Sequence, residues 1–228
     1  MTEEQLLTQE QILKKAEEVI ARGPFTDTWA SLCGYRAPSW YQDAKFGVFI
    51  HWGVYSVPAF ANEWYPRHMY IPGRPEFEHQ RKTYGDQKTF GYKDFLPMFR
   101  AEKFDAAEWM QLIEDSGAKY VMPVAEHHDG FQMYESKLSH WNAAEMGPRR
   151  DVLGELKREA EARGITFCAS DHRAEHCWFF NGGLTFESDV SENPDFYDFQ
   201  VPAEDSDRMK HDLYAPVPPK AHLDNWLA

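Results

Sequence analysis

Two adjacent histidines and an aspartate stand directly behind a short apolar run, and these residues offer the clearest chemistry in the sequence. The apolar run spans residues 120–125, and Glu126, His127, His128 and Asp129 follow it. An apolar run without strict alternation is typical of a parallel strand that is buried on both faces. In β/α barrels the functional groups lie at the carboxyl ends of such strands. Imidazole and carboxylate groups at that position could bind a metal ion or form hydrogen bonds with a polar ligand.

The directions of the two histidines are the first question. Neighbouring side chains on a strand point to opposite faces, so only one of His127 and His128 can enter a pocket unless the strand has already ended. Gly130 favours a loop at this point. The alternative is that both rings are ordinary packed side chains, and the spacing alone does not decide between the two interpretations.

The order of an apolar run followed by polar groups occurs twice more. Residues 46–51 form a β-rich run that ends in His51, and Trp52 follows it. Residues 165–169 form a third run, and His172 stands shortly after it. The sequence therefore predicts three buried strands that each deliver a histidine at the carboxyl end.

The segment after the first predicted strand adds Glu63 and Trp64, and the combination suits a carbohydrate site. Aromatic rings pack on the C–H faces of a pyranose, while imidazole and carboxylate groups form hydrogen bonds with its hydroxyls. Each residue is a weak signal by itself, because a single tryptophan is more often a core residue and a single glutamate a surface charge. His176 is interpreted as a structural histidine.

Helices must separate the strands if the sheet is parallel. Asp105 and Asp151 stand at the N-cap positions of two predicted helices, which end at Gly117 and Gly164. This alternation of helix and strand indicates a parallel sheet or a barrel. Residues 54–90 contain four prolines and show no periodicity, which predicts a long loop.

The first residues differ in character from the rest. An amphipathic helix is predicted over residues 2–22, with Thr2 and Gln5 as a capping box and Gly23 at its end. Its apolar stripe indicates a packing or docking role. A second, incomplete helix is predicted over residues 220–228.

Composition excludes several classes of partner. The net charge of -13 and the pI of about 5.2 disfavour nucleic acid, and no apolar run approaches the length of a membrane span. No signal peptide is visible, so the location is unknown, with a cytoplasmic location only as the default. The three cysteines form no CxxC pair, which makes a disulfide framework or a cysteine metal site unexpected. The oligomeric state leaves no visible signal.

Four segments together carry a resemblance to a known family. Residues 44–58, 62–65, 119–131 and 150–156 are similar, in content and order, to the N-terminal half of the α-L-fucosidases of glycoside hydrolase family 29. The resemblance runs from about residue 40 to the end of the chain. It implies retaining hydrolysis of terminal α-L-fucosides of a fucosylated oligosaccharide or glycoconjugate, without a cofactor.

The resemblance also implies a fold and a division of the chain. The expected fold is α/β, a (β/α)8-like (TIM) barrel of which about three strands are present. Residues 1–23 are then an N-terminal helical extension, and residues 24–228 are the N-terminal portion of the catalytic barrel, truncated at the C-terminus.

On matching positions the resemblance assigns a set of sugar-binding residues. These are His51, Glu63, Trp64, His127, His128 and His172. Residues 169–176 depart from the tyrosine-bearing strand end of the better-known members and are similar to a subgroup with the sequence His-Arg-Ala-Glu-His. His172 is placed in the pocket on that basis, and Arg173 and Glu175 receive no role.

The catalytic carboxylates are not found in this sequence. A retaining glycosidase needs a nucleophile and an acid/base about 5 Å apart, and the resemblance places the nucleophilic aspartate at the end of the fourth strand. Residues 223–228 resemble the start of the helix before that strand, so both carboxylates are expected after Ala228. The 228 residues alone are expected to be inactive. Asp129 and Asp171 match no catalytic position.

Two other functions fit parts of the same pattern. A metal-dependent hydrolase would use as ligands His51, His127, His128, His172 and Glu63. The spacings HxH and HExxH are missing from the sequence, however, and Arg173 is a poor neighbour for a cation. A non-catalytic fucose-binding protein would keep the sugar contacts without the carboxylates.

Overall fold

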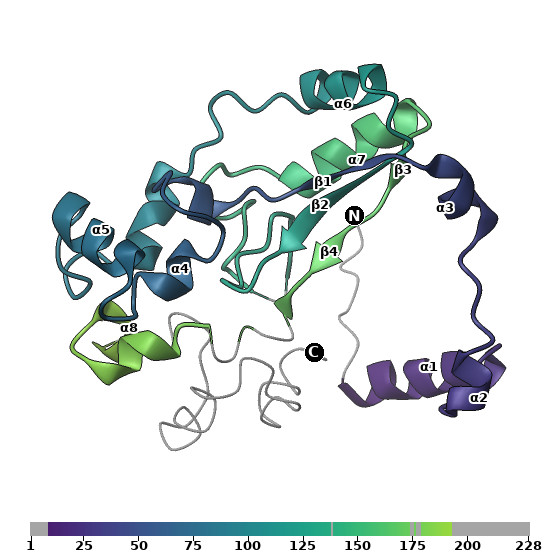
Figure 1. Ribbon diagram of the computed structural model, residues 1–228, viewed down its shortest axis with the longest axis horizontal. Helices are drawn as coiled ribbons and strands as arrows, with labels where there is room; N and C mark the ends of the chain where they lie inside the picture. Colours follow the sequence, from purple (N-terminus) through teal and green to yellow (C-terminus); the bar gives the residue numbers. More distant parts are fainter. Residues whose placement is uncertain (1–8, 138, 174–175, 177–178, 193–228) are drawn as a thin grey trace.

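A parallel sheet with β2 (Tyr120–Glu126) at its centre organises the fold (Figure 1). The computed structural model describes residues 9–137, 139–173, 176 and 179–192. β1 (Gly47–Ile50) pairs with one side of β2, and β3 (Thr166–Phe167) and β4 (Ser170–Asp171) follow each other along the other side. All three pairings are parallel, which confirms the predicted α/β class with a parallel sheet. Within the described residues the sheet has two free sides, along β1 and along β3 and β4.

The third predicted strand is divided into β3 and β4, and Pro123 of β2 gives the reason. The backbone N–H of Cys168 donates to the carbonyl of Val121 at 2.8 Å. The next rung of a parallel ladder would need an N–H from Pro123, which proline lacks. The pairing resumes only where Val124 lies opposite Ser170.

A bulge near the end of β2 changes the direction of the chain. Val124 pairs with Ser170 and Glu126 with Asp171, so β2 has one residue more than β4 between the two pairs. The carbonyl of the extra residue, Ala125, accepts instead from the N–H of Met133 at 2.8 Å. Bulges of this kind redirect the side chains that follow them, and the residues that follow this one are His127 and His128.

Two capped helices accompany the sheet, as predicted. α7 (Val152–Ala162) packs on β2 and β3, and α6 (Ala106–Asp115) lies beside α7 (Figure 1). The side chain of Asp105 accepts from the backbone N–H three residues later at 3.0 Å, and that of Asp151 does the same at 2.9 Å. These are the predicted N-caps.

The core between the helices and the sheet follows from helical spacing. Val152, Leu156 and Ala160 recur every four residues on α7 and are all buried. Met110 and Ile113 of α6 lie in the same hydrophobic core. Side chains four residues apart share one face of a helix, so the sequence pattern alone fixes which face packs inward.

The prediction of a long loop over residues 54–90 was wrong. The segment contains η1 (Val54–Ser56), α4 (Tyr65–His68) and α5 (Pro75–Thr83), where η marks a 3₁₀ helix. Two of the prolines that indicated a loop, Pro66 and Pro75, stand in the first turns of α4 and α5. A proline costs a helix little there, because the N–H groups of the first turn have no partner within the helix.

These short helices form a second layer beyond the carboxyl ends of the strands (Figure 1). η2 (Tyr92–Met98), η4 (Asn181–Thr185) and α8 (Asp189–Glu192) complete it. Its interior consists of fully buried aromatic side chains, namely Tyr65, Tyr70, Tyr92, Phe95, Phe179 and Phe180. The rings make tilted and edge-to-face contacts, which aromatic side chains prefer. A rigid layer therefore lies against the strand ends.

The N-terminal segment extends away from the sheet (Figure 1). It contains α1 (Gln9–Arg22), α2 (Trp29–Leu32) and α3 (Ser39–Ala44), and residues 9–44 are called the N-terminal arm below. α1 ends before Gly23, as predicted, and residues 1–8 of the predicted helix lie outside the described residues, as does the helix predicted over residues 220–228. The division of the chain at residue 23 stays a prediction.

In the described part of the chain, no helix is long and apolar enough to cross a membrane. Cys33 and Cys168 are free thiols, and Cys177 is outside the described residues.

Candidate active site at the strand ends

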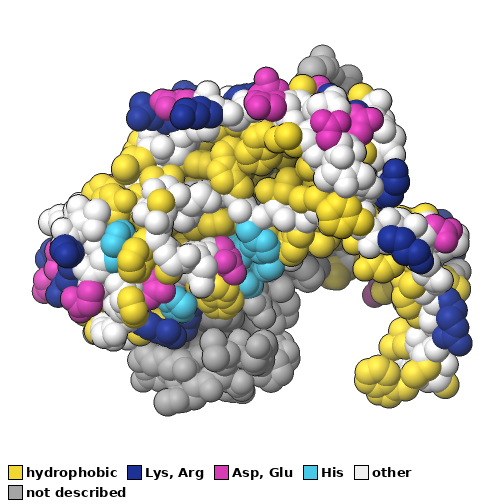
Figure 2. Space-filling view, turned by 45° about the horizontal axis from the view of Figure 1, so that its top comes forward, with side chains coloured by type: hydrophobic (Ala, Val, Ile, Leu, Met, Phe, Trp, Pro, Cys, Tyr) yellow, Lys and Arg dark blue, Asp and Glu magenta, His cyan; other side chains and the backbone are white. Residues whose placement is uncertain are grey.

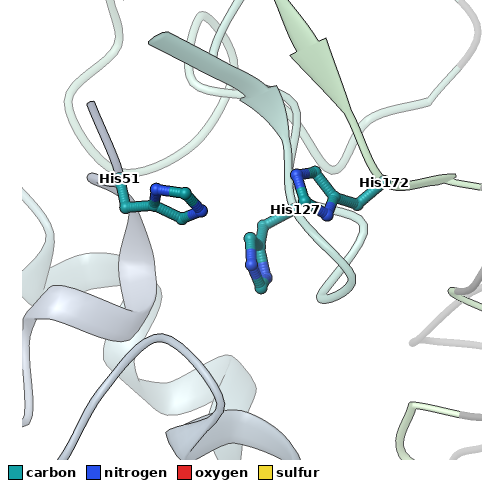
Figure 3. Close-up of side chains that lie close together, drawn as sticks. All are labelled: His51, His127 and His172. Carbon is teal, nitrogen blue, oxygen red and sulfur yellow. The ribbon is translucent and has the colours of Figure 1, made fainter. Parts of the chain in front are cut away.

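Three histidines from three strand ends point toward one another (Figure 3). His51 follows β1, His127 follows β2 and His172 follows β4. One ring nitrogen of each lies within 4.8 Å of those of the other two. The rings of His127 and His172 are stacked, with centroids 4.8 Å apart. The parallel sheet thus brings together residues that are far apart in the sequence.

A tight turn places His127 and His128 in the same site. β2 ends at Glu126, and the N–H of Gly130 donates to the carbonyl of His127 at 2.9 Å. Because the strand has ended, the two rings are not forced to opposite faces, and both contact His172, with centroids 4.8 and 4.7 Å away. The turn therefore decides in favour of the interpretation in which both histidines share one site.

His128 and His172 are also joined by a hydrogen bond. The Nε2 atom of His128 lies 3.3 Å from Nδ1 of His172, and Nε2 of His172 lies 3.0 Å from Oγ of Ser170. Ring nitrogens that share hydrogen bonds in this way hold an imidazole in one orientation. Ser170 and His128 thus fix the ring of His172.

Aromatic rings form one wall of the site. The ring of Trp64, at the start of α4, lies 5.1 Å from that of His128 and 5.6 Å from that of Phe179. Phe179 stacks on His128 at 5.4 Å. Its carbonyl accepts from Arg67 at 3.1 Å, which ties this wall to α4. The wall offers an apolar face beside the imidazoles.

Glu63 lines a cavity beside the histidines. The cavity measures about 350 Å³ and is lined by residues that include His51, Tyr55 and Glu63. The ring of Tyr55 lies 5.1 Å from that of His127. Its hydroxyl is buried and finds no hydrogen-bond partner within the described residues. Burial, together with Asp129 and Glu63, raises the pKa of Tyr55, so this hydroxyl stays protonated.

A buried ion pair joins the two strand ends that carry His127 and His172. Arg173 Nη1 donates to Oε1 of Glu126 at 3.1 Å, and both side chains are buried. Gln132 donates to the other carboxylate oxygen of Glu126 at 3.0 Å. Burial raises the pKa of Glu126 to about 7, while Arg173 and Gln132 act in the opposite direction. The pair links the residue before His127 to the residue after His172.

Asp129 and His176 have structural contacts. Asp129 is buried, accepts from the hydroxyl of Tyr92 at 2.6 Å and accepts from the N–H of Phe131 at 3.1 Å. Nδ1 of His176 lies 2.7 Å from the carbonyl of His128. The interpretation of His176 as a structural histidine is consistent with this contact.

The imidazoles of His127 and His128 are neutral at neutral pH. Burial lowers the pKa of His127 far below its usual range, and His128, His172 and His51 add to the effect. Burial also lowers the pKa of His128 to about 4, again with a contribution from His172. A neutral imidazole has one donor and one acceptor, so the cluster can form hydrogen bonds with hydroxyl groups or give lone pairs to a metal ion.

All six residues predicted for the site lie around it. Their roles in binding stay predictions. Sequence reasoning missed Tyr55, Phe179 and the pair of Glu126 with Arg173. Tyr55 carried a signal, because it stands four residues after the first strand-end histidine. Arg173 had no role by sequence, Asp171 accepts from the N–H of Arg173 at 2.7 Å, and Glu175 lies outside the described residues.

The fold and the site define a parallel α/β protein with a histidine-rich, aromatic-walled site at the carboxyl edge of its sheet. Open α/β sheets and barrels hold their active sites at this edge. The chain belongs to the α-L-fucosidase family, whose model matches residues 12–218.

Individual relatives agree with the family. The tissue α-L-fucosidase of Homo sapiens is 43% identical over 145 residues, which are 63% of this chain and 31% of that protein. The α-L-fucosidase of Dictyostelium discoideum is 42% identical, over 60% of this chain and 31% of that protein. The chain therefore spans about a third of the length of the curated relatives it matches.

Solved structures show the same likeness. The α-fucosidase of Thermotoga maritima, in complex with a mechanism-based inhibitor, has a TM-score of 0.64 and 31% identity, over 89% of this chain and 54% of that one. The structure of that enzyme with fucose has a TM-score of 0.62, over 89% of this chain and 53% of that one.

Proposed function

We propose that the protein is a retaining α-L-fucosidase and that this chain supplies sugar-binding residues of a (β/α)8-like barrel. The observation that carries the proposal is the convergence of His51, His127, His128 and His172 from three strand ends, in a chain of the α-L-fucosidase family. The complex of the Thermotoga maritima enzyme with fucose supports the choice of sugar. The neutral imidazoles of His127 and His128 match the hydroxyls of a neutral sugar, because each can donate and accept.

The aromatic wall suits the apolar part of the same sugar. Fucose carries a methyl group where most hexoses carry a hydroxymethyl group. Trp64 is partly exposed and presents an apolar ring face beside His128, and the fully buried Phe179 packs against both rings. Burial of a methyl group against such a ring contributes about 0.8 kcal/mol. The imidazoles would then face the ring hydroxyls, with Glu63 accepting from one of them.

The carboxylates of the retaining reaction are proposed to lie beyond the third strand, in agreement with the family resemblance. The reaction needs two carboxyl groups about 5 Å apart. Asp129 is buried in contacts with Tyr92 and Phe131, and Asp171 caps the N–H of Arg173. Neither matches a catalytic position of the family resemblance, so we expect the 228 residues to bind fucose without hydrolysing fucosides.

Calorimetric titration of the chain with L-fucose tests the binding half of the proposal. His51→Ala removes an exposed imidazole and should weaken binding about tenfold, the effect of one hydrogen bond. His140→Ala, on a surface side chain that is 88% exposed, should leave the affinity unchanged. Absence of fucose binding, or equal binding by both variants, would contradict the proposed site.

The catalytic half is tested with 4-nitrophenyl α-L-fucoside. We expect no release of 4-nitrophenol by the purified 228 residues, and release by a longer natural product that contains them. Turnover by the 228 residues would contradict the placement of the carboxylates. Fucose binding without turnover by the longest natural product would instead indicate a non-catalytic fucose-binding protein.

A further inference from the structure

The three-histidine cluster has a donor set that sugar binding alone does not require. Three imidazoles are a common ligand set for Zn²⁺ in proteins, and a metal–nitrogen distance near 2.0–2.1 Å places the nitrogens about 3.4 Å apart in a tetrahedral site. The ring nitrogens of His51, His127 and His172 lie within 4.8 Å of one another. His51 is exposed, so its side chain has room to move toward the other two rings when an ion binds.

We propose that His51, His127 and His172 bind a divalent transition-metal ion such as Zn²⁺, and that this ion excludes the sugar from the site. The metal would act as a competitive inhibitor rather than as a cofactor. The metal site rests on the geometry of the cluster alone, whereas the competition also rests on the proposed function.

The hydrogen bonds around the cluster suit ligation. Nδ1 of His127 is buried and has no hydrogen-bond partner within the described residues. The two ring nitrogens of His172 face Ser170 and His128, so one contact remains when the other nitrogen turns to the metal. A contact to the second ring nitrogen fixes the orientation of a metal-binding histidine and strengthens the site.

Of the two arginines that are buried near the cluster among the described residues, Arg173 is paired with a carboxylate. Arg173 was the objection to a metal at the level of the sequence, but its guanidinium is paired with the Glu126 carboxylate at 3.1 Å. Arg67 donates to the carbonyl of Phe179 and to the side chain of Asn181, each at 3.1 Å. Its positive charge lowers the pKa of His128, which is not one of the three proposed ligands. Glu63 lines the cavity next to His51, so a carboxylate borders this side of the site.

His172 is the third imidazole of the cluster, and its replacement tests the ligand set directly. With a phenol in place of the third imidazole, the cluster would keep only two histidine ligands, which hold Zn²⁺ less well. His172→Tyr is therefore the most informative variant, because it removes the third imidazole and keeps an aromatic ring at this position.

The first experiment titrates the whole chain with ZnCl₂ by calorimetry, and with CoCl₂ by visible absorption, in a buffer that does not bind metals. We expect one ion per chain. His51→Ala and His172→Tyr should each weaken binding at least about tenfold, because even the loss of a residue that only supports a ligand costs 10–100-fold. His140→Ala is the matched surface control and should bind like the unchanged chain. Absence of a one-to-one complex, or unchanged binding by His51→Ala, would overturn the proposal.

A competition experiment separates this inference from the proposed function. L-fucose should raise the apparent dissociation constant of Zn²⁺ by a factor of one plus the ratio of the fucose concentration to the dissociation constant of fucose. Zinc binding that depends on His51 and His172, in a chain that does not bind fucose, would leave the metal site standing and remove the proposed function. Simultaneous binding of both ligands would overturn the competition.

Discussion

At the scale of single residues, Gly130 shows how closely the turn after β2 is packed. Its φ of +74° lies in the left-handed region that favours glycine. A Cβ atom at this position would lie 2.6 Å from Cε1 of His176. His176 also contacts the carbonyl of His128 at 2.7 Å, so a side chain at position 130 would disturb the turn that holds the two site histidines.

We predict that Gly130→Ala destabilises the fold more than Gly117→Ala does. Gly117 has a similar φ of +83° but no atom within 4 Å of its Cβ position, so Gly117→Ala should cost only about 1–2 kcal/mol for the left-handed backbone. The contact with His176 should add about 1–3 kcal/mol at position 130. Denaturant unfolding measures both values. Equal losses would show that the His176 ring moves aside freely.

Glu126 and Arg173 form the second feature at this scale. The two side chains are buried, and the pair joins the end of β2 to the residue after His172. Removal of one partner from a buried ion pair leaves an uncompensated charge, whereas replacement of both by apolar groups is often neutral. The main effect of the pair is therefore to fix how the two strand ends meet, and its net contribution to the free energy of unfolding is small.

We predict that Arg173→Met lowers the free energy of unfolding by about 3 kcal/mol and that the double variant Glu126→Met with Arg173→Met recovers most of this loss. Denaturant unfolding of the single and double variants forms a double-mutant cycle. If the losses of the two single variants simply add, the pair has no coupling and this account of it is wrong.

At the scale of elements, α4 and α5 meet through a titratable contact. Nδ1 of His68 in α4 lies 3.3 Å from Oε1 of Glu76 in α5. Burial lowers the pKa of His68, Arg74 and Arg67 act in the same direction, and Glu76 opposes them. The ring of Trp64 stacks on His68 at 6.2 Å, so this contact also supports the aromatic wall of the site.

The His68 contact should make the fold sensitive to acid. A histidine whose native pKa is below its unfolded value binds more protons when unfolded, so stability rises with pH up to the ordinary value near 6.5 and falls on acidification below it. We predict that His68→Gln, which cannot titrate, loses less stability between pH 7 and pH 5 than the unchanged chain. Thermal unfolding at the two pH values measures this, with His140→Gln as the surface control. If His68→Gln loses as much stability on acidification as the unchanged chain, the loss comes from other titratable groups.

At the scale of the whole molecule, the N-terminal arm differs from the rest of the structure, the described residues from 45 to 192, which are called the body here. Large apolar side chains are exposed on the arm, with Trp29 82% and Ile20 68% exposed, and Figure 2 shows hydrophobic side chains along it. The body buries its aromatic layer completely, as Tyr65 and Phe95 show. Segments with few buried contacts open most easily.

We predict that limited digestion with trypsin cleaves the arm before the body. Arg22 and Arg36 are exposed, and local opening of the arm requires little loss of buried surface. Mass spectrometry should show early products that begin after these residues and retain the sheet. Cleavage within residues 47–173 before the arm is cut would show that the arm is covered in solution.

The local sequence determined the parts of this protein that depend on neighbouring residues. The two N-caps at Asp105 and Asp151, the buried face of α7 and the three apolar runs follow from helical and strand spacing. The family resemblance named His51, His127 and His172 as site residues, and the fold placed them together. Local patterns are decisive here because a cap or a buried stripe involves residues three or four positions apart.

Only the tertiary structure decided how these parts meet. The helices between residues 54 and 90, the division of the third strand at Pro123 and the ion pair of Glu126 with Arg173 all depend on which segments lie side by side. The contact of Glu126 with Arg173 joins residues 47 positions apart. The register of the sheet and the turn at Gly130 determine how close such distant residues come. Several segments that are far apart in the chain fix this register together, so it cannot be read from local sequence patterns.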